Sequence, residues 1–180
     1  MTDAQLEQLR YPVGRYQSPE QITPALIEQW IQDIEQLPQQ LSELLTDWTS
    51  EQLATPYREG GWSVKKLIHH IADSHLNSYA RFKWALTEDQ PTIKAYDEQA
   101  WAELPDCEIT DVQISLQLLQ ALHHRWVHLL RSLSQADLEK SFVHPETGKS
   151  IVLDENIAHY AWHSRHHLAH IIALKTRNNW

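Results

Sequence analysis

The stretch Asn156-Ile-Ala-His-Tyr-Ala-Trp-His-Ser-Arg-His-His-Leu-Ala-His-Ile-Ile-Ala-Leu174 contains five of the twelve histidines in the chain. It lacks Gly and Pro and is rich in Ala, Leu and Ile, so we predict a helix over residues 156–174. Asp154 or Asn156 is expected to cap its N-terminus. At about 100° per residue, one face of this helix collects Tyr160, His163, His167, His170, Ile171 and Leu174.

Histidines on an apolar helix face need a partner for each ring nitrogen, because a neutral imidazole carries one donor and one acceptor. A metal ion meets this need, and two imidazoles four residues apart can bind the same zinc or nickel ion. A single His-x-x-x-His pattern is nevertheless more typical of hydrogen-bonded core or surface histidines. The metal hypothesis therefore depends on a second histidine elsewhere in the chain.

The composition predicts one helical domain that spans residues 1–180. Hydrophobic residues make up 42% of the chain and Gly occurs only four times, a balance that favours an all-α fold with one core. The net charge of −9 and the lack of a Lys/Arg cluster argue against a nucleic-acid partner.

The N-terminal residues lack the basic and apolar segments of a signal peptide, and no run reaches the ~20 apolar residues of a membrane span. We therefore expect a cytoplasmic protein that does not contact a membrane. The lone cysteine, Cys107, excludes an intramolecular disulfide and a Cys-rich metal site. We expect it to lie in a loop.

Hydrophobic periodicity predicts three further long helices, over residues 23–48, 64–86 and 111–133. Thr23 and Ser63 are the expected N-caps of the first two, and Pro24 suits a first helical position.

The segments between these helices have other patterns. Residues 1–22 are expected to form an ordered arm, and residues 87–109 an ordered loop with one short helix near 98–104. Residues 141–153 predict a small β-hairpin with Gly148 at the positive-φ position. The expected fold is a four-helix bundle with this hairpin before the last helix.

The helix predicted over residues 64–86 carries a polar row beside its apolar arc. The row consists of His70, Ser74, Asn77 and Arg81, a pattern that is equally typical of a solvated face. His70 borders the apolar arc, which suits an inward-facing metal ligand. We assign the other three residues to a substrate pocket.

Four other polar residues are interpreted as having no part in the site. We expect His123, His124 and His128 to be core or surface histidines, because no second metal-style pattern accompanies them. Asp73 is expected to be an exposed acid on the helix surface.

The second and last helices of a bundle can present one and two histidines to a common point. Three imidazole nitrogens leave an open coordination position, which in zinc enzymes holds a water with a lowered pKa. Spacing alone leaves several sets open. His69 or His75 could replace His70, and the pairs His159/His163 or His166/His170 could replace His163/His167.

Motifs over nearly the whole chain resemble the YfiT-like metal-dependent hydrolases of the DinB-like superfamily of four-helix bundles. The matching stretches are Leu9-Arg-Tyr-Pro-Val-Gly14, Tyr57-Arg-Glu-Gly-Gly-Trp-Ser-Val64, His69-His-Ile-Ala-Asp-Ser-His-Leu-Asn-Ser-Tyr-Ala-Arg-Phe-Lys83, Trp101-Ala-Glu-Leu-Pro105 and Tyr160-Ala-Trp-His-Ser-Arg-His-His-Leu-Ala-His-Ile171.

The resemblance implies one divalent metal ion per subunit, Zn²⁺ or Ni²⁺, held by His70, His163 and His167 in a cytoplasmic homodimer. It implies a hydrolase in which the metal activates water to attack a small-molecule substrate. Related bundles of the superfamily imply an alternative, a thiol S-transferase that uses a low-molecular-weight thiol of the bacillithiol or mycothiol type. A third hypothesis is a metal-stabilised scaffold without catalysis, against which the polar row of the second helix argues.

Overall fold

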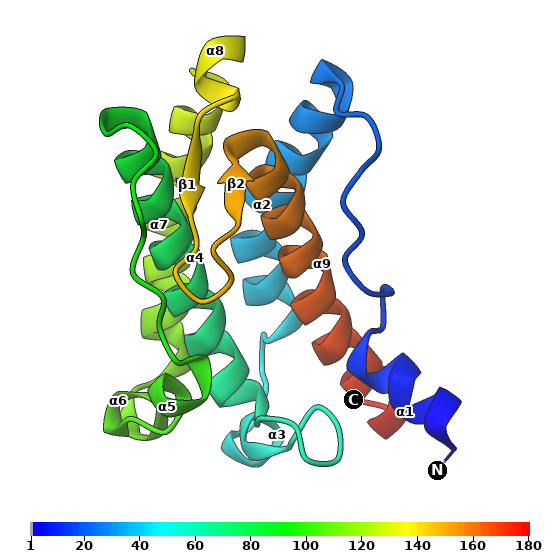
Figure 1. The fold of residues 1–180 in the computed structure, drawn as a ribbon. Coiled ribbons are helices and arrows are strands. Elements are labelled where there is room, and N and C mark those ends of the chain that lie inside the picture. Colours follow the sequence, from blue (N-terminus) through cyan, green and yellow to red (C-terminus); the bar gives the residue numbers. More distant parts are fainter. Residues whose placement is uncertain (1) are drawn as a thin grey trace.

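Four long helices form the frame of the molecule in the computed structural model, which describes residues 2–180 (Figure 1). They are α2 (Pro24–Leu44), α4 (Val64–Thr87), α7 (Val112–Arg131) and α9 (Leu153–Asn178). Helix α2 packs against α7 and α9, and α4 packs against the same two helices from the other side. The expected four-helix bundle is confirmed.

Shorter elements connect and flank the bundle. The helices are α1 (Asp3–Arg10), α3 (Ser50–Ala54), α5 (Glu98–Ala102), α6 (Pro105–Ile109) and α8 (Gln135–Leu138). Strands β1 (Ser141–Val143) and β2 (Ser150–Val152) form the expected antiparallel hairpin directly before α9. Gly148 in its turn has φ +65°, which a residue without a Cβ adopts readily.

Side-chain caps fix the starts of α2 and α4 as expected. Thr23 Oγ1 accepts a hydrogen bond from the Leu26 amide, and Ser63 Oγ accepts one from the Lys66 amide. The expected cap of the last helix is wrong. Helix α9 begins at Leu153, directly after β2, without a side-chain cap, so Asp154 and Asn156 already lie in its first turn.

The segment between α4 and α7 also differs from the prediction. It contains two short helices, α5 and α6, where one was expected. Cys107 is buried in α6 and does not lie in a loop. Pro105 occupies the first turn of α6, where its missing N–H leaves no helical hydrogen bond unmade.

The core consists of two apolar clusters at different heights along the bundle. One cluster is built around Trp30, Phe82, Trp126 and Phe142. The other is built around Leu37, Leu67, Leu119 and Ile171. Along α4, α7 and α9, buried histidines occur between the residues of the two clusters.

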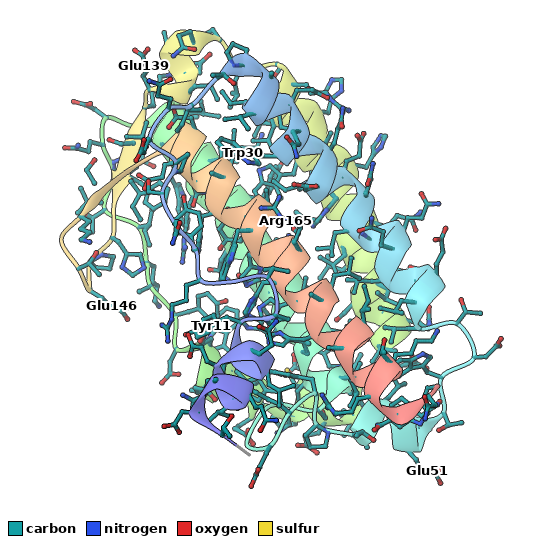
Figure 2. The ribbon with its side chains drawn as sticks, turned by 90° about the vertical axis from the view of Figure 1, so that its right-hand side faces the viewer. Tyr11, Trp30, Glu51, Glu139, Glu146 and Arg165 are labelled. Atoms are coloured by element: carbon teal, nitrogen blue, oxygen red, sulfur yellow. The ribbon has the colours of Figure 1, made fainter. Side chains whose placement is uncertain are left out.

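The chain that leads from α1 to α2 runs along α9 (Figures 1 and 2). Trp162 Nε1 donates a hydrogen bond to the Gly14 carbonyl over 3.0 Å, and His170 Nε2 donates one to the Arg10 carbonyl over 3.2 Å. These bonds hold the arm against α9, which carries five of the twelve histidines. Among the described residues, no helix is long and apolar enough to cross a membrane.

Candidate metal centre

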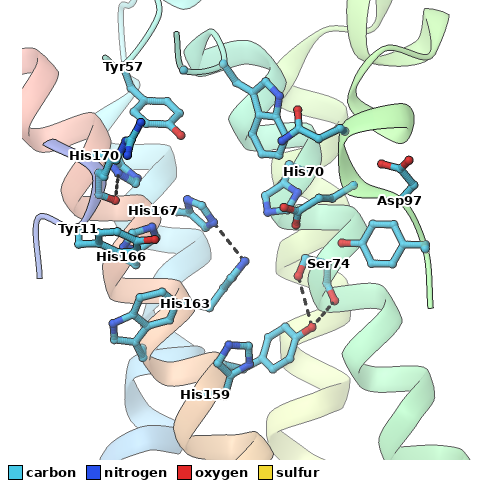
Figure 3. Close-up of a pocket in the computed structure, with 18 of the residues that line it drawn as sticks. Tyr11, Tyr57, His70, Ser74, Asp97, His159, His163, His166, His167 and His170 are labelled. Carbon is cyan, nitrogen blue, oxygen red and sulfur yellow. Dashed lines mark hydrogen bonds between the residues drawn. The ribbon is translucent and has the colours of Figure 1, made fainter. Parts of the chain in front are cut away.

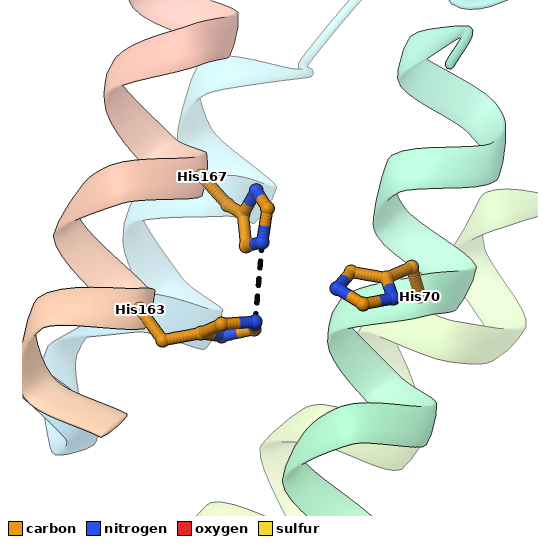
Figure 4. A group of neighbouring side chains, drawn as sticks. All are labelled: His70, His163 and His167. Carbon is orange, nitrogen blue, oxygen red and sulfur yellow. Dashed lines mark hydrogen bonds between the residues drawn. The ribbon is translucent and has the colours of Figure 1, made fainter. Parts of the chain in front are cut away.

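Three histidines from two facing helices meet inside the bundle. His163 and His167 lie one turn apart on α9, and His70 faces them from α4 (Figure 4). Each offers one ring nitrogen such that the three nitrogens lie within 4.8 Å of one another. Nε2 of His163 and Nε2 of His167 are 3.1 Å apart. The structure thus brings together the three histidines that the family resemblance implies as ligands.

Burial keeps these three rings neutral near neutral pH. His70, His163 and His167 are 5%, 8% and 7% exposed. Burial lowers the pKa of His70 to about 4. Burial and, to a lesser extent, the neighbouring imidazoles hold the pKa of His163 and of His167 well below the usual value. A neutral imidazole has a free lone pair, so the three rings form a nitrogen donor set suited to a divalent transition metal.

The three rings border a cavity of about 980 Å³ (Figure 3). Its wall is built from the arm, the loop before α4, helices α4 and α9, the segment before α5 and the hairpin turn. It contains charges of both signs, contributed by Arg10, Arg58, Arg81, Asp97, Glu98, Glu103 and Glu146. A cavity of this size accommodates a small molecule.

Two of the three expected pocket residues lie at this cavity. Ser74 and Arg81 line it. The Ser74 carbonyl accepts a hydrogen bond from the Tyr160 hydroxyl over 3.1 Å, which joins α4 to α9 beside the histidines. Asn77 does not line the cavity, because its side-chain amide turns back and donates to the Asp73 carbonyl over 2.9 Å.

The alternative histidines of α4 point elsewhere. Nδ1 of His69 is 2.8 Å from Ser115 Oγ on α7. His75 is fully buried, and its Nε2 lies 3.0 Å from Nδ1 of His163, on the side of that ring away from His167. Neither residue lines the cavity. Of the three candidates on this helix, His70 alone does so.

His159, His166 and His170, which the sequence offered only as members of alternative ligand pairs, all line the same cavity. His166, His167 and His170 form a second group whose nitrogens lie within 4.8 Å of one another. Burial lowers the pKa of His166 to about 3 and that of His170 to about 4. The spacing of His166 and His170, four residues apart, already indicated that they could serve as an alternative pair of ligands. Residue spacing does not show how deeply each imidazole ring is buried.

Helical bundles that direct histidines from facing helices to one point are a recurrent architecture of metalloproteins. This chain belongs to the DinB superfamily, whose family model matches residues 33–171. The resemblance found in the sequence is thereby confirmed.

Similar proteins cover almost the whole chain. Relatives from Bacillus cereus (strain 03BB102) and Bacillus mycoides (strain KBAB4), both named "Putative metal-dependent hydrolase", are each 53% identical over 97% of this chain and all of their own length. The solved structure of YfiT from Bacillus subtilis matches with a TM-score of 0.93 and 47% identity, over 96% of this chain and 99% of YfiT. It is described as a probable metal-dependent hydrolase with an unusual four-helix bundle topology.

Proposed function

We propose that this protein is a metal-dependent hydrolase in which His70, His163 and His167 hold one divalent ion per subunit. The observation that carries the proposal is the donor set itself: three buried, neutral imidazoles at the wall of a cavity of about 980 Å³. Zn²⁺ is the expected ion and Ni²⁺ the alternative, because imidazole suits both. The names of the relatives support dependence on a metal and hydrolysis as the reaction class.

Such an ion lowers the pKa of water and polarises a carbonyl group, which makes hydrolysis feasible at neutral pH. The protein supplies binding and orientation. Arg81 offers a cation to a carboxylate or another acceptor of the substrate, and the bond from Tyr160 to Ser74 keeps the cavity wall rigid next to His70. The substrate class that fits is a small polar molecule with a hydrolysable ester or amide bond.

A second candidate function is transfer of a low-molecular-weight thiol to an electrophile at the same three histidines. The observation that favours it is the charged wall of the cavity, with Arg10, Arg58 and Arg81 beside four carboxylates, which suits a charged cosubstrate better than water. A scaffold without catalysis remains a third candidate, which the cavity and its charges disfavour. By family resemblance we further propose a single domain in a cytoplasmic homodimer.

The metal content of single-histidine variants tests the donor set. His70→Ala, His163→Ala and His167→Ala should each weaken Zn²⁺ binding at least tenfold, about 1.4 kcal/mol, measured by competition with a chromophoric chelator. His128→Ala removes an exposed histidine of α7 and is the matched control. A folded His163→Ala protein that retains one ion per subunit after dialysis against a mild chelator would exclude this site.

The reaction class is tested with zinc-loaded protein on two substrate panels. One panel contains esters and amides, and the other pairs low-molecular-weight thiols with electrophiles. Hydrolysis that is lost in the three alanine variants supports the first function. Thiol transfer with the same histidine dependence replaces the first function by the second. Metal binding without turnover in either panel would support the third candidate, a scaffold without catalysis.

A further inference from the structure

A chain of buried histidines leads from the backbone of α2 through the bundle to His163. Nδ1 of His123 on α7 lies 2.6 Å from the Ile34 carbonyl oxygen. Nε2 of His123 lies 2.9 Å from Nδ1 of His75, and Nε2 of His75 lies 3.0 Å from Nδ1 of His163. His75 and His123 are 0% and 2% exposed. Three rings on three helices are thus joined head to tail.

The carbonyl at one end gives the whole chain a direction. A carbonyl oxygen only accepts, so Nδ1 of His123 carries a proton and donates to Ile34. A neutral ring has one N–H, so Nε2 of His123 is an acceptor, and the proton in the next bond sits on Nδ1 of His75. By the same step, Nε2 of His75 accepts from Nδ1–H of His163. All three rings are therefore in the Nδ1–H form.

Neutral rings are what this environment favours. Burial lowers the pKa of His123 to about 4. An imidazolium enclosed by other rings and a carbonyl would lack the charge partner that a buried cation needs. The Trp126 ring packs edge-on against both rings, with centroids 5.7 Å from His75 and 5.8 Å from His123, which restricts rotation of either imidazole.

The direction of the chain decides which nitrogen of His163 is free. With its proton on Nδ1, His163 presents the lone pair of Nε2 toward His167, 3.1 Å away (Figure 4). A free neutral histidine in water prefers to carry its proton on Nε2, which is the form that cannot bind a metal through Nε2. The hydrogen bond at one ring nitrogen sets the state of the other.

We infer that His75 and His123 are positioning residues that hold His163 as a ready-made Nε2 ligand, anchored at the Ile34 carbonyl. This inference rests on the proposed metal centre. The chain acts as a clamp and not as a path for protons to leave the site, because it ends at a carbonyl group that neither takes up nor releases a proton. Sequence spacing could not reveal the clamp, because the residues that contact one another lie far apart in the sequence. His75 and His123 are 48 residues apart, and His75 and His163 are 88 apart.

The first experiment observes the clamp directly in metal-free wild-type protein. Long-range ¹⁵N–¹H correlation spectra of protein labelled at histidine distinguish a protonated ring nitrogen from a bare one. We expect His75, His123 and His163 to carry their protons on Nδ1, with assignments from single-histidine variants. A proton on Nε2 of His163 would overturn the inference. The measurement needs neither metal nor activity, so its failure is distinct from failure of the proposed function.

The second experiment separates hydrogen-bond direction from packing. His75→Leu removes the acceptor for Nδ1–H of His163 at similar volume and should weaken Zn²⁺ binding about 10- to 100-fold. In His75→Gln the amide offers an oxygen to His163 and its NH₂ to His123, so this variant should recover most of the lost affinity. His123→Leu should weaken binding less than His75→Leu, because His75 can then adopt either form.

The outcomes of the second experiment are read against His128→Leu, which changes an exposed residue of α7. An affinity of His75→Leu equal to that of the wild type would refute the clamp. Equal losses in His75→Leu and His75→Gln would show that only the shape of the ring matters, and would refute it as well. If His75→Leu fails to fold, the spectra of the wild-type protein still decide the question.

Discussion

Acidification from pH 7 to pH 5 should strongly destabilise the metal-free protein, because several imidazoles are buried in their neutral form. Burial lowers the pKa of His70 and of His123 to about 4, whereas a histidine in an unfolded chain titrates near ~6.5. Between these two values the unfolded chain binds more protons than the native state. The contribution of these rings to the free energy of unfolding therefore has its full value above about pH 6.5, and it falls as the pH drops toward about 4.

The size of the effect follows from these pKa values. One ring with a native pKa of about 4 and an unfolded pKa of about 6.5 loses roughly 1.8 kcal/mol between pH 7 and pH 5. His70 and His123 together account for about 3 to 4 kcal/mol. The contribution of His70 is an upper value, because it borders the cavity, where water screens charge; the same screening reduces the contributions of His166 and His170. The sum is a large share of the ~5–15 kcal/mol that stabilises a typical domain.

Urea unfolding followed by tryptophan fluorescence at pH 7, 6 and 5, in the presence of a chelator, measures this loss. The eight tryptophans provide the signal. His128→Gln, which removes an exposed ring, should leave the difference between pH 7 and pH 5 unchanged, whereas His123→Gln should reduce it. A free energy of unfolding at pH 5 within about 1 kcal/mol of its value at pH 7 would refute the reasoning.

Two further predictions concern packing and assembly. A Cβ on Gly61 would lie 2.8 Å from Arg58 Cγ and 3.1 Å from Tyr57 Cζ, so Gly61→Ala should cost about 1–3 kcal/mol and lower the Tm by roughly 2–10 °C; an unchanged Tm in a calorimetric scan would contradict the crowding. The homodimer that the family resemblance implies should appear in sedimentation equilibrium at concentrations on the order of tens of micromolar, and a monomeric mass there would exclude it.

The helices and the hairpin were predictable because their signals are local. Thr23, Pro24 and Ser63 mark helix starts through groups within three residues of them, and Gly148 marks a turn through its own backbone freedom. The cap of α9 was not predictable in this way. The hairpin continues directly into the helix at Leu153, so the start of α9 is set by strand pairing and not by Asp154 or Asn156.

The candidate site also has a part that local sequence patterns predict and a part that they do not. Periodicity within α9 favoured His163 and His167, and the apolar arc of α4 favoured His70. Such predictions are possible because the helix face on which a residue lies depends only on its position along that helix. Which ring each histidine touches depends on how far one helix is shifted along its neighbour, and no residue spacing encodes that shift. The sequence therefore left His75 open as an alternative metal ligand and indicated a core or surface role for His123. It also placed Asn77 in the pocket, although the Asn77 amide bonds its own helix.

The placement of the histidines explains how a bundle can bury so many of them. His75 lies between Ala72 and Phe82 on α4, and His123 lies between Leu119 and Trp126 on α7, so in each helix the ring separates a residue of one apolar cluster from a residue of the other. Each such ring costs free energy unless both nitrogens have partners. The rings partner one another from Ile34 to His163, and the series ends at the Nε2 lone pair of His163, which lies 3.1 Å from Nε2 of His167. The same arrangement that makes the polar layer tolerable in the core thus leaves its last acceptor at the cavity, where the proposed divalent cation would bind it.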